Sequence, residues 1–278
     1  MSLYTGKTAL IIGGTHGIGL ATAKLLLHHG ATVLITGNRP EPIAAAQAEL
    51  STLTSNSPNT ATIIQFDITS TASLTPLQTA VETHLGGGGG LGKEKSIDLL
   101  FINSGFAALL PTTATSEESF DRILNTNTRG PFFLAQRFAP AVKPGGSILF
   151  TTSTSITTGI PGMAAYSASK AAIYSFVQTL AAEMAHAARK EGEGEGEEAV
   201  RVNAISPGYV DTPTLGVVGI SGEERREFVE VGKKLTPMGR IARVEEVARA
   251  VVFMGFEATF STGSEFLMDG GLRYLARE

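Results

Sequence analysis

The feature that most restricts how this chain can fold lies within its first thirty residues, where an apolar run, a glycine-rich turn and a helical pattern follow one another. Residues 8–12 (TALII) are rich in β-formers and suit a strand buried on both faces. The turn GGTHGIG occupies residues 13–19, and leucines and alanines then recur at helical spacing until Gly30. Strand, glycine turn and helix in this order are the context that a phosphate-binding loop requires.

The glycines of this turn predict a nucleotide site. They allow a tight bend, a close approach of the backbone to a pyrophosphate, and close packing of the helix, whose amino-terminal amides then face the anion. The spacing alone is weak, because 32 of the 278 residues are glycine, so the prediction depends on the flanking strand and helix. The predicted contacts of the turn are Gly13, Thr15, His16, Gly17, Ile18 and Gly19.

The residues after the second strand pattern, at 32–36, bear on the choice of nucleotide. A dinucleotide fold that binds a free ribose 2′-hydroxyl usually places Asp or Glu at the end of this strand. Here Asn38 and Arg39 follow the strand, and no acid occurs before Glu41. Arg39 can pair with a 2′-phosphate, with His16 placed to assist, so the sequence favours NADP(H) over NAD(H). The alternative is an exposed loop arginine without a ligand.

Two further strand ends carry candidate contacts. The strand pattern at 61–67 ends at Asp67 and Ile68, where an adenine could be held, although Asp67 could equally cap the next helix. The strand pattern at 97–102 stops at Asn103, Ser104 and Gly105. This turn of small residues fits backbone contact with a bound nucleotide, and it also fits an ordinary turn.

The predicted chemistry lies between Ser153 and Lys170. Tyr166 and Lys170 are four residues apart, which places them on one face of a helix. A free tyrosine has a pKa of about 10, and a nearby ammonium favours the phenolate. Ser153 follows the strand pattern at 147–152 and can donate a hydrogen bond to the oxygen that Tyr166 would protonate. The alternative for the isolated pair is a surface lysine beside a half-buried tyrosine.

Asn127 stands within a helical pattern that runs from residue 117 through residue 130. A buried asparagine in a helix is costly unless its amide finds partners. A water held there could connect the Lys170 ammonium to solvent and resupply the proton that Tyr166 gives up.

Composition limits the remaining possibilities. A length of 278 residues suits one large α/β domain or two small ones, and a net charge of −4 argues against a nucleic-acid or anionic-membrane surface. The absence of cysteine excludes disulfides, thiolate catalysis and cysteine-ligated zinc, and no metal site is predicted. The amino terminus shows no cleavable signal pattern, and no apolar run is long enough to span a bilayer. We expect a soluble, cytoplasmic protein.

The order of these motifs resembles that of the short-chain dehydrogenase/reductase family, nearly from end to end. After the glycine turn, the 103–105 turn, Asn127 and the Ser153, Tyr166 and Lys170 set come Pro207 and Gly208, behind a sixth strand pattern. Residues 237–247 and 268–271 also resemble the family's last helix and strand. The resemblance implies a single domain over residues 1–278, a Rossmann-like doubly wound α/β fold with a seven-stranded parallel sheet and helices on both faces, and a homotetramer or homodimer.

The resemblance also implies roles for individual residues. Tyr166 would be the general acid/base, Ser153 would orient the substrate carbonyl, Lys170 would lower the tyrosine pKa and hold the nicotinamide ribose, and Asn127 would support the water relay. The chain departs from the family pattern at Ser104, which replaces alanine, and at Ile12, where many members have a threonine that could brace the loop. The residues expected to close over the nicotinamide carboxamide are Pro207, Gly208, Val210 and Thr212.

The expected function is therefore NADPH-dependent reduction of a ketone or aldehyde to an alcohol. The alternatives are oxidation of an alcohol, a non-redox reaction of the same family, and a catalytically idle nucleotide-binding protein. A substrate lid is expected at about 212–236, and low-complexity insertions at 86–95 and 190–198 should lie away from the active site. The side chains that line the lid, or else pack on the core, are Tyr209, Leu215, Val217 and Val218.

Overall fold

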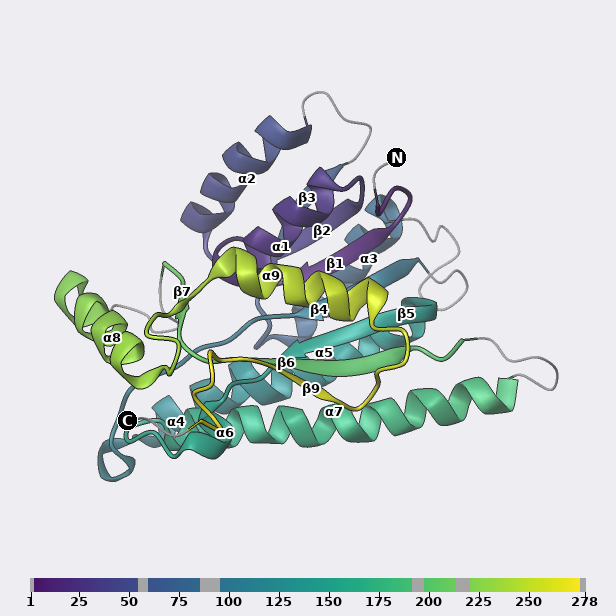
Figure 1. Cartoon of the computed structure of the whole chain (residues 1–278). Coiled ribbons are helices and arrows are strands. Elements are labelled where there is room, and N and C mark those ends of the chain that lie inside the picture. Colours follow the sequence, from purple (N-terminus) through teal and green to yellow (C-terminus); the bar gives the residue numbers. More distant parts are fainter. Residues whose placement is uncertain (1–2, 55–59, 86–95, 192–197, 214–220, 276–278) are drawn as a thin grey trace.

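A seven-stranded parallel sheet forms the centre of the computed structural model, which describes residues 3–54, 60–85, 96–191, 198–213 and 221–275 (Figure 1). The spatial order of the strands is β3-β2-β1-β4-β5-β6-β9. This order reverses between β1 and β4, and in open α/β sheets ligands bind beyond the carboxyl ends of the strands at such a point. The strands are β1 (Thr8–Ile12), β2 (Thr32–Gly37), β3 (Ala61–Gln65), β4 (Ile97–Ile102), β5 (Val142–Thr151), β6 (Arg201–Pro207) and β9 (Glu265–Met268).

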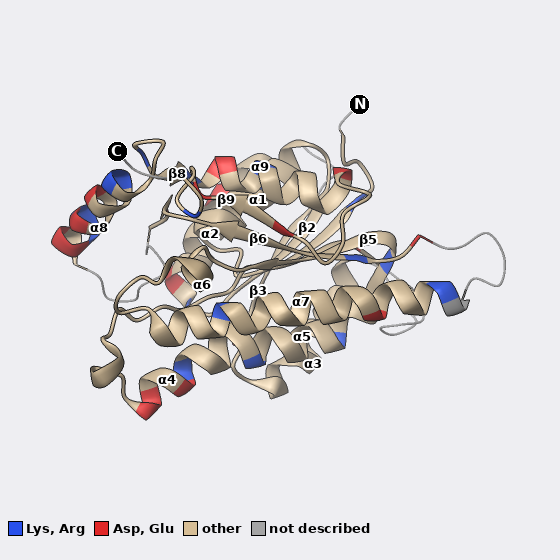
Figure 2. Ribbon diagram, turned by 60° about the horizontal axis from the view of Figure 1, so that its bottom comes forward, with Lys and Arg blue, Asp and Glu red and all other residues tan. Residues whose placement is uncertain are grey.

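Helices cover both faces of the sheet, which confirms the predicted doubly wound fold (Figures 1 and 2). One face packs against α1 (Gly17–His28), α2 (Pro40–Thr54) and α9 (Val244–Val252), and the other against α3 (Leu74–His84), α5 (Gly130–Phe138) and α7 (Ala164–Glu191). The remaining elements are η1 (Thr71–Ser73), η2 (Thr112–Ala114), α4 (Glu117–Leu124), η3 (Asn125–Arg129), η4 (Ala139–Ala141), α6 (Ser155–Thr158), β7 (Val210–Asp211), α8 (Gly222–Leu235), β8 (Ala242–Arg243) and η5 (Phe253–Glu257).

The first strand shows why its apolar run folds in this way. Leu10 and Ile12 pack into the core beneath α3, α5 and α7, whereas Ala9 and Ile11 pack into the core beneath α1, α2 and α9. Alternate side chains of a strand point to opposite faces, so a strand covered on both sides must be apolar at every position. The prediction of a doubly buried strand is confirmed.

Two strands differ in extent from their sequence patterns. β5 begins at Val142 rather than at residue 147, because Ile97 pairs with Val142 and Leu99 with Ser147, which leaves an irregular stretch between them. Pro144 in that stretch lacks a backbone donor, and Gly145 has a φ of 71°, so the residues read as a loop in the sequence although the strand continues through them. β3 ends at Gln65 and leaves Asp67 beyond the sheet.

The first predicted insertion, 86–95, and residues 192–197 of the second lie outside the described part of the chain. Their described neighbours are at the amino ends of the strands. Ser96 precedes β4 and donates to the Ala141 carbonyl, and the Glu198 carbonyl accepts a hydrogen bond from Gly145. Within the described ranges, no helix combines the length and the apolar character needed to cross a membrane.

Candidate active site

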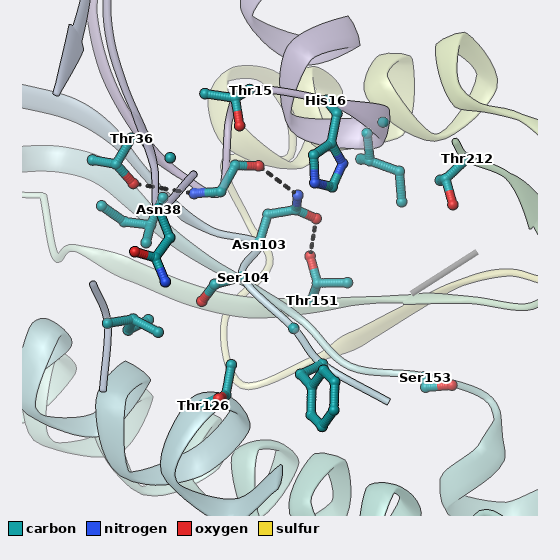
Figure 3. A pocket seen from close by; sticks show the side chains of 18 of the residues that line it. Thr15, His16, Thr36, Asn38, Asn103, Ser104, Thr126, Thr151, Ser153 and Thr212 are labelled. Atoms are coloured by element: carbon teal, nitrogen blue, oxygen red, sulfur yellow. Dashed lines mark hydrogen bonds between the residues drawn. The ribbon is translucent and has the colours of Figure 1, made fainter. Parts of the chain in front are cut away.

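A cavity of about 590 Å³ lies where the carboxyl ends of β1, β2, β4, β5 and β6 meet (Figure 3). All but two of the predicted site residues line it. Gly19 and Asn127 do not belong to the lining. Gly19 packs against Gly13, and Asn127 hydrogen-bonds to Phe106, both of which line the cavity. The predicted residues that line the cavity are Gly13, Thr15, His16, Gly17, Ile18, Asn38, Arg39, Asp67, Ile68, Asn103, Ser104, Gly105, Ser153, Tyr166, Lys170, Pro207, Gly208, Val210 and Thr212.

The glycine turn has no room for side chains at the predicted positions. A Cβ on Gly19 would lie 2.2 Å from the carbonyl oxygen of Gly13, and one on Gly13 would lie 3.0 Å from the backbone nitrogen of Ser104. Gly13 and Gly17 also have positive φ values, of 78° and 56°. Only glycine therefore fits these positions, and Gly13 and Gly17 line the cavity beside the amino terminus of α1, where anions can bind to backbone amides.

Side chains from two neighbouring strands brace this turn. Thr36 Oγ1 accepts a 3.2 Å hydrogen bond from the backbone nitrogen of Gly13. Asn103 Nδ2 donates to the Gly13 carbonyl at 3.1 Å, and Asn103 Oδ1 accepts from Thr151 Oγ1 at 2.9 Å (Figure 3). Thr36 of β2 thus provides a hydroxyl that braces the turn, which a threonine in place of Ile12 could have done. Neither Thr36 nor Thr151 is recognisable from the sequence as part of this site, because only the pairing of the strands brings them to the turn.

At the far end of the cavity, Arg39 presents a positive charge. Its side chain is exposed, and its guanidinium makes no ion pair or hydrogen bond with another residue that the structure describes. The pKa of nearby His16 is lowered, first by burial of the imidazole and second by the charge of Arg39. The His16 imidazole at the start of α1 and the exposed Arg39 guanidinium, which follows β2, together form a site suited to an anion.

Asp67 serves a local turn. Its Oδ1 accepts hydrogen bonds from the backbone nitrogen of Thr69 at 2.9 Å and from the Thr69 hydroxyl at 2.8 Å. Ser70 and Ser73, not Asp67, occupy the N-cap positions of η1 and α3. The helix-cap interpretation of Asp67 is therefore wrong, because the chain makes an additional turn before the helix begins. Asp67 and Ile68 do line the cavity, as the alternative requires.

Tyr166 and Lys170 come together on the first turns of α7. The Lys170 ammonium lies 5.9 Å from the centre of the Tyr166 ring, and it donates a 2.8 Å hydrogen bond to the carbonyl of Thr151, the last residue of β5. Ser153, two residues beyond that strand, lines the same cavity and hydrogen-bonds with the Tyr166 hydroxyl. The side chains predicted to carry the chemistry are therefore adjacent.

Burial dominates the electrostatic balance at Tyr166. Burial raises the pKa of the Tyr166 hydroxyl, and this effect outweighs the hydrogen bond with Ser153, which lowers that pKa. The net direction is therefore upward, and Lys170, whose ammonium is bonded to the Thr151 carbonyl, is not among the causes of this shift. A lowering of the tyrosine pKa by Lys170 stays a prediction. Burial also lowers the pKa of Lys170 itself to about 8. At neutral pH the tyrosine is a phenol and the lysine is charged.

Asn127 connects the 103–106 turn to the catalytic helix. Its amide accepts from the Phe106 backbone nitrogen at 2.8 Å and donates to the Phe106 carbonyl at 2.8 Å and to Ser169 Oγ at 3.0 Å. Ser169 in turn donates to the Tyr166 carbonyl at 2.6 Å. The predicted need for amide partners is met by the protein itself, within a π-helical segment that interrupts the helix. Its support of a water relay stays a prediction.

Aromatic side chains complete the wall near Tyr166. Phe106 lines the cavity with the Arg122 guanidinium stacked 4.1 Å above its ring, and Tyr209 lies 5.0 Å from Phe228 of α8. Of these residues only Tyr209 is predicted from the sequence. Phe106, Arg122 and Phe228 belong to no sequence motif, so no pattern indicates them. Leu215, Val217 and Val218 lie outside the described residues.

The helix of the predicted lid is held against the cavity by Arg225. This residue of α8 pairs with Asp211 and donates to the Thr212 carbonyl at 3.4 Å. Thr212 in turn contacts the glycine turn, since a Cβ on Gly17 would lie 3.2 Å from its methyl carbon. The lid segment and the nucleotide turn thus meet across the cavity.

Known proteins similar to this chain share its length and its fold. A family model described as enoyl-(acyl carrier protein) reductase matches residues 13–273. Oxidoreductase asL5 of Sarocladium schorii is 34% identical, and the match covers 96% of each chain. Hydroxynaphthalene reductase-like protein Arp2 of Metarhizium robertsii and versicolorin reductase stcU of Emericella nidulans are each 30% identical, over 96% of this chain and 95% of theirs.

Solved structures of similar proteins have the same fold as this chain. A short chain dehydrogenase/reductase family protein superimposes with a TM-score of 0.78 at 30% identity, covering 99% of this chain and 100% of the other. An NADPH-bound short chain oxidoreductase of Pseudomonas aeruginosa, described as containing an atypical catalytic center, has a TM-score of 0.79 at 26% identity, over 98% and 99% of the two chains. With its sheet, glycine turn and Ser153, Tyr166 and Lys170 cluster, this chain is an oxidoreductase that belongs to the short-chain dehydrogenase/reductase family.

Proposed function

We propose that this protein reduces a ketone or aldehyde to an alcohol with NADPH, and that Tyr166 is the general acid. The observation that carries the proposal is the meeting of Ser153, Tyr166 and Lys170 in one cavity with the glycine turn. The raised pKa of Tyr166 supports the reductive direction, because a buried phenol keeps its proton at neutral pH until a substrate oxygen becomes basic enough to take it.

The residues of the cavity fit a dinucleotide. Gly13 and Gly17 line the cavity beside the amino terminus of α1, whose backbone amides could hold a pyrophosphate. Arg39 supports NADP(H) over NAD(H), since its exposed guanidinium follows the strand end where an acid would hold a ribose 2′-hydroxyl. Pro207, Gly208, Val210 and Thr212 would hold the nicotinamide end, as the family resemblance implies.

In the proposed reaction bound NADPH supplies the hydride that reduces the carbonyl carbon, and side chains of the protein supply the proton and the hydrogen bonds. Ser153 donates a hydrogen bond to the carbonyl oxygen and orients it, and Tyr166 donates the proton that completes the alcohol. The charged Lys170 stabilises the phenolate that forms as Tyr166 loses its proton. Asn127 fixes the Phe106 backbone and, through Ser169, the helix that carries Tyr166.

An aromatic ketone is the substrate class that the cavity supports best. Phe106, Tyr209 and Phe228 offer ring faces and edges to a flat, carbon-rich molecule. Relatives at 30% identity are named as reductases of versicolorin and as hydroxynaphthalene reductase-like, which is consistent with this class.

We also propose that the protein assembles as a homodimer or homotetramer through α7 and the neighbouring α5. Residues 171–182 of α7 contain no charged side chain (Figure 2), and Phe132 of α5 is 41% exposed beside Phe176, with ring centres 4.7 Å apart. An exposed aromatic ring next to an uncharged helix face is typical of an interface. A cytoplasmic location stays a prediction.

The proposed function is tested by absorbance spectroscopy. The purified protein is mixed separately with NADPH and NADH and with a panel of aromatic ketones, aliphatic ketones, aldehydes and quinones. We expect faster loss of the reduced nicotinamide signal with NADPH, and fastest with an aromatic ketone. If neither cofactor is consumed with any carbonyl, the idle nucleotide-binding alternative is favoured.

A further inference from the structure

The Ser104 hydroxyl is a buried polar group that the fold leaves without a partner. Of the residues whose buried side-chain polar atoms lack a hydrogen bond within the described ranges, Ser104 is the one that lines the cavity. Figure 3 shows it between Asn38 and Thr126. A buried hydroxyl without a partner costs free energy, and a ligand that supplies the missing hydrogen bond recovers it.

The position of Ser104 assigns it to one end of the cavity. Its backbone lies against the glycine turn, since a Cβ on Gly13 would be 3.0 Å from the Ser104 nitrogen. The next residue, Gly105, faces the other end, because a Cβ there would be 3.4 Å from Lys170 Nζ. Successive residues of this turn therefore face different parts of the cavity. Gly105 lies at the Lys170 end, and Ser104 lies against the glycine turn, near Asn38 in Figure 3.

We propose that the Ser104 hydroxyl makes a hydrogen bond to the adenosine half of NADPH and raises the affinity of this chain for the cofactor. The inference rests on the proposed function, and it goes beyond the backbone contact expected of this turn. Alanine at this position, as the family pattern has it, would bind the same nucleotide with one hydrogen bond fewer. Ser104 is a positioning residue for the nucleotide and takes no part in proton transfer.

Ser104→Ala tests the proposal, and Ser147→Ala is its matched control. Ser147 also carries a buried hydroxyl without a partner, but it lies on β5 beside Leu99 and Arg201, away from the cavity. Dissociation constants for NADPH and for adenosine 2′,5′-bisphosphate are measured by calorimetry, together with the melting temperature with and without NADPH. The second ligand contains the adenosine half alone.

We expect Ser104→Ala to weaken both ligands about five- to tenfold, the effect of one hydrogen bond. Its melting temperature without ligand should equal or exceed that of the unchanged protein, since an unsatisfied buried group has been removed, and the rise on adding NADPH should be smaller. Ser147→Ala should bind both ligands as the unchanged protein does.

Equal NADPH affinity in Ser104→Ala and the unchanged protein would overturn the inference. A loss of affinity for NADPH without a loss for adenosine 2′,5′-bisphosphate would overturn the assignment to the adenosine half. A parallel loss in Ser147→Ala would also contradict it, since deleting any buried hydroxyl would then suffice. Failure of the unchanged protein to bind NADPH at all is a different result, which refutes the proposed function itself.

Discussion

The ammonium of Lys170 donates a 2.8 Å hydrogen bond to the carbonyl of Thr151, the last residue of β5. This bond joins the catalytic helix to the strand that precedes Ser153, and it holds a charge beside the Tyr166 ring at 5.9 Å. This contact between helix and sheet is one of those that hold Tyr166, the proposed proton donor, close to Ser153.

Removing the Tyr166 hydroxyl should abolish reduction and spare cofactor binding. Tyr166→Phe deletes the proton donor while keeping the ring, and general acid catalysis typically contributes ~100 to 10,000-fold to the rate. We expect kcat for ketone reduction to fall by at least about 100-fold, with the NADPH dissociation constant changed only a few fold. Full activity in this variant would refute the role of Tyr166.

Reduction should weaken as the pH rises through about 8. Lys170 is charged below its lowered pKa of about 8 and neutral above it, so the stabilisation of the developing phenolate is lost in that range. The measurement is kcat/KM for ketone reduction from pH 6 to 10. A rate that stays level up to pH 10 would show that the charge of Lys170 is not required.

The same lysine predicts a dependence of stability on pH. Because its folded pKa lies below the ordinary value of 10.5, the unfolded chain binds more protons between about pH 8 and 10.5, and the folded state gains stability as pH rises there. The free energy of unfolding, measured in urea at several pH values, should rise over this window relative to that of Lys170→Met. Parallel pH curves for the two proteins would contradict the lowered pKa.

Arg39 should determine the choice between the two nicotinamide cofactors. Replacing its guanidinium in Arg39→Ala removes the partner of the 2′-phosphate, so KM for NADPH should rise about tenfold or more while KM for NADH changes little. Arg137→Ala is the control, because Arg137 lies on α5 and hydrogen-bonds to Gln78, outside the cavity. An equal rise for both cofactors would argue against a 2′-phosphate contact.

Gly19 should tolerate no side chain. In Gly19→Ala the new methyl group would lie 2.2 Å from the Gly13 carbonyl, so the turn must shift, at a typical cost of about 1–3 kcal/mol in stability. We expect NADPH binding to be lost in calorimetry. Gly222→Ala at the start of α8 is the control, since its methyl group would meet only the end of the Arg226 side chain, at 3.9 Å. Wild-type affinity in Gly19→Ala would show that the turn can relax.

Local sequence patterns are enough to predict the buried strands of the sheet and most residues of the candidate site. Apolar runs such as 8–12 specify doubly buried strands through their composition, and glycines at 13, 17 and 19 specify a bare turn. Tyr166 and Lys170 are four residues apart on a helix, so local geometry alone brings them to one face. These features depend on short-range rules of backbone geometry and burial, which a single sequence displays.

The tertiary structure decided what depends on neighbours distant in the chain. Strand order brings Thr36 and Asn103 to Gly13. Helix packing brings Lys170 to the Thr151 carbonyl, and it places the rings of Phe106 and Phe228 in the cavity wall. The same holds for the direction of the Tyr166 pKa, because the sequence does not show the burial of the hydroxyl, which outweighs its hydrogen bond with Ser153. Contact partners and desolvation are properties of the packed molecule, since each depends on residues that only the fold brings together.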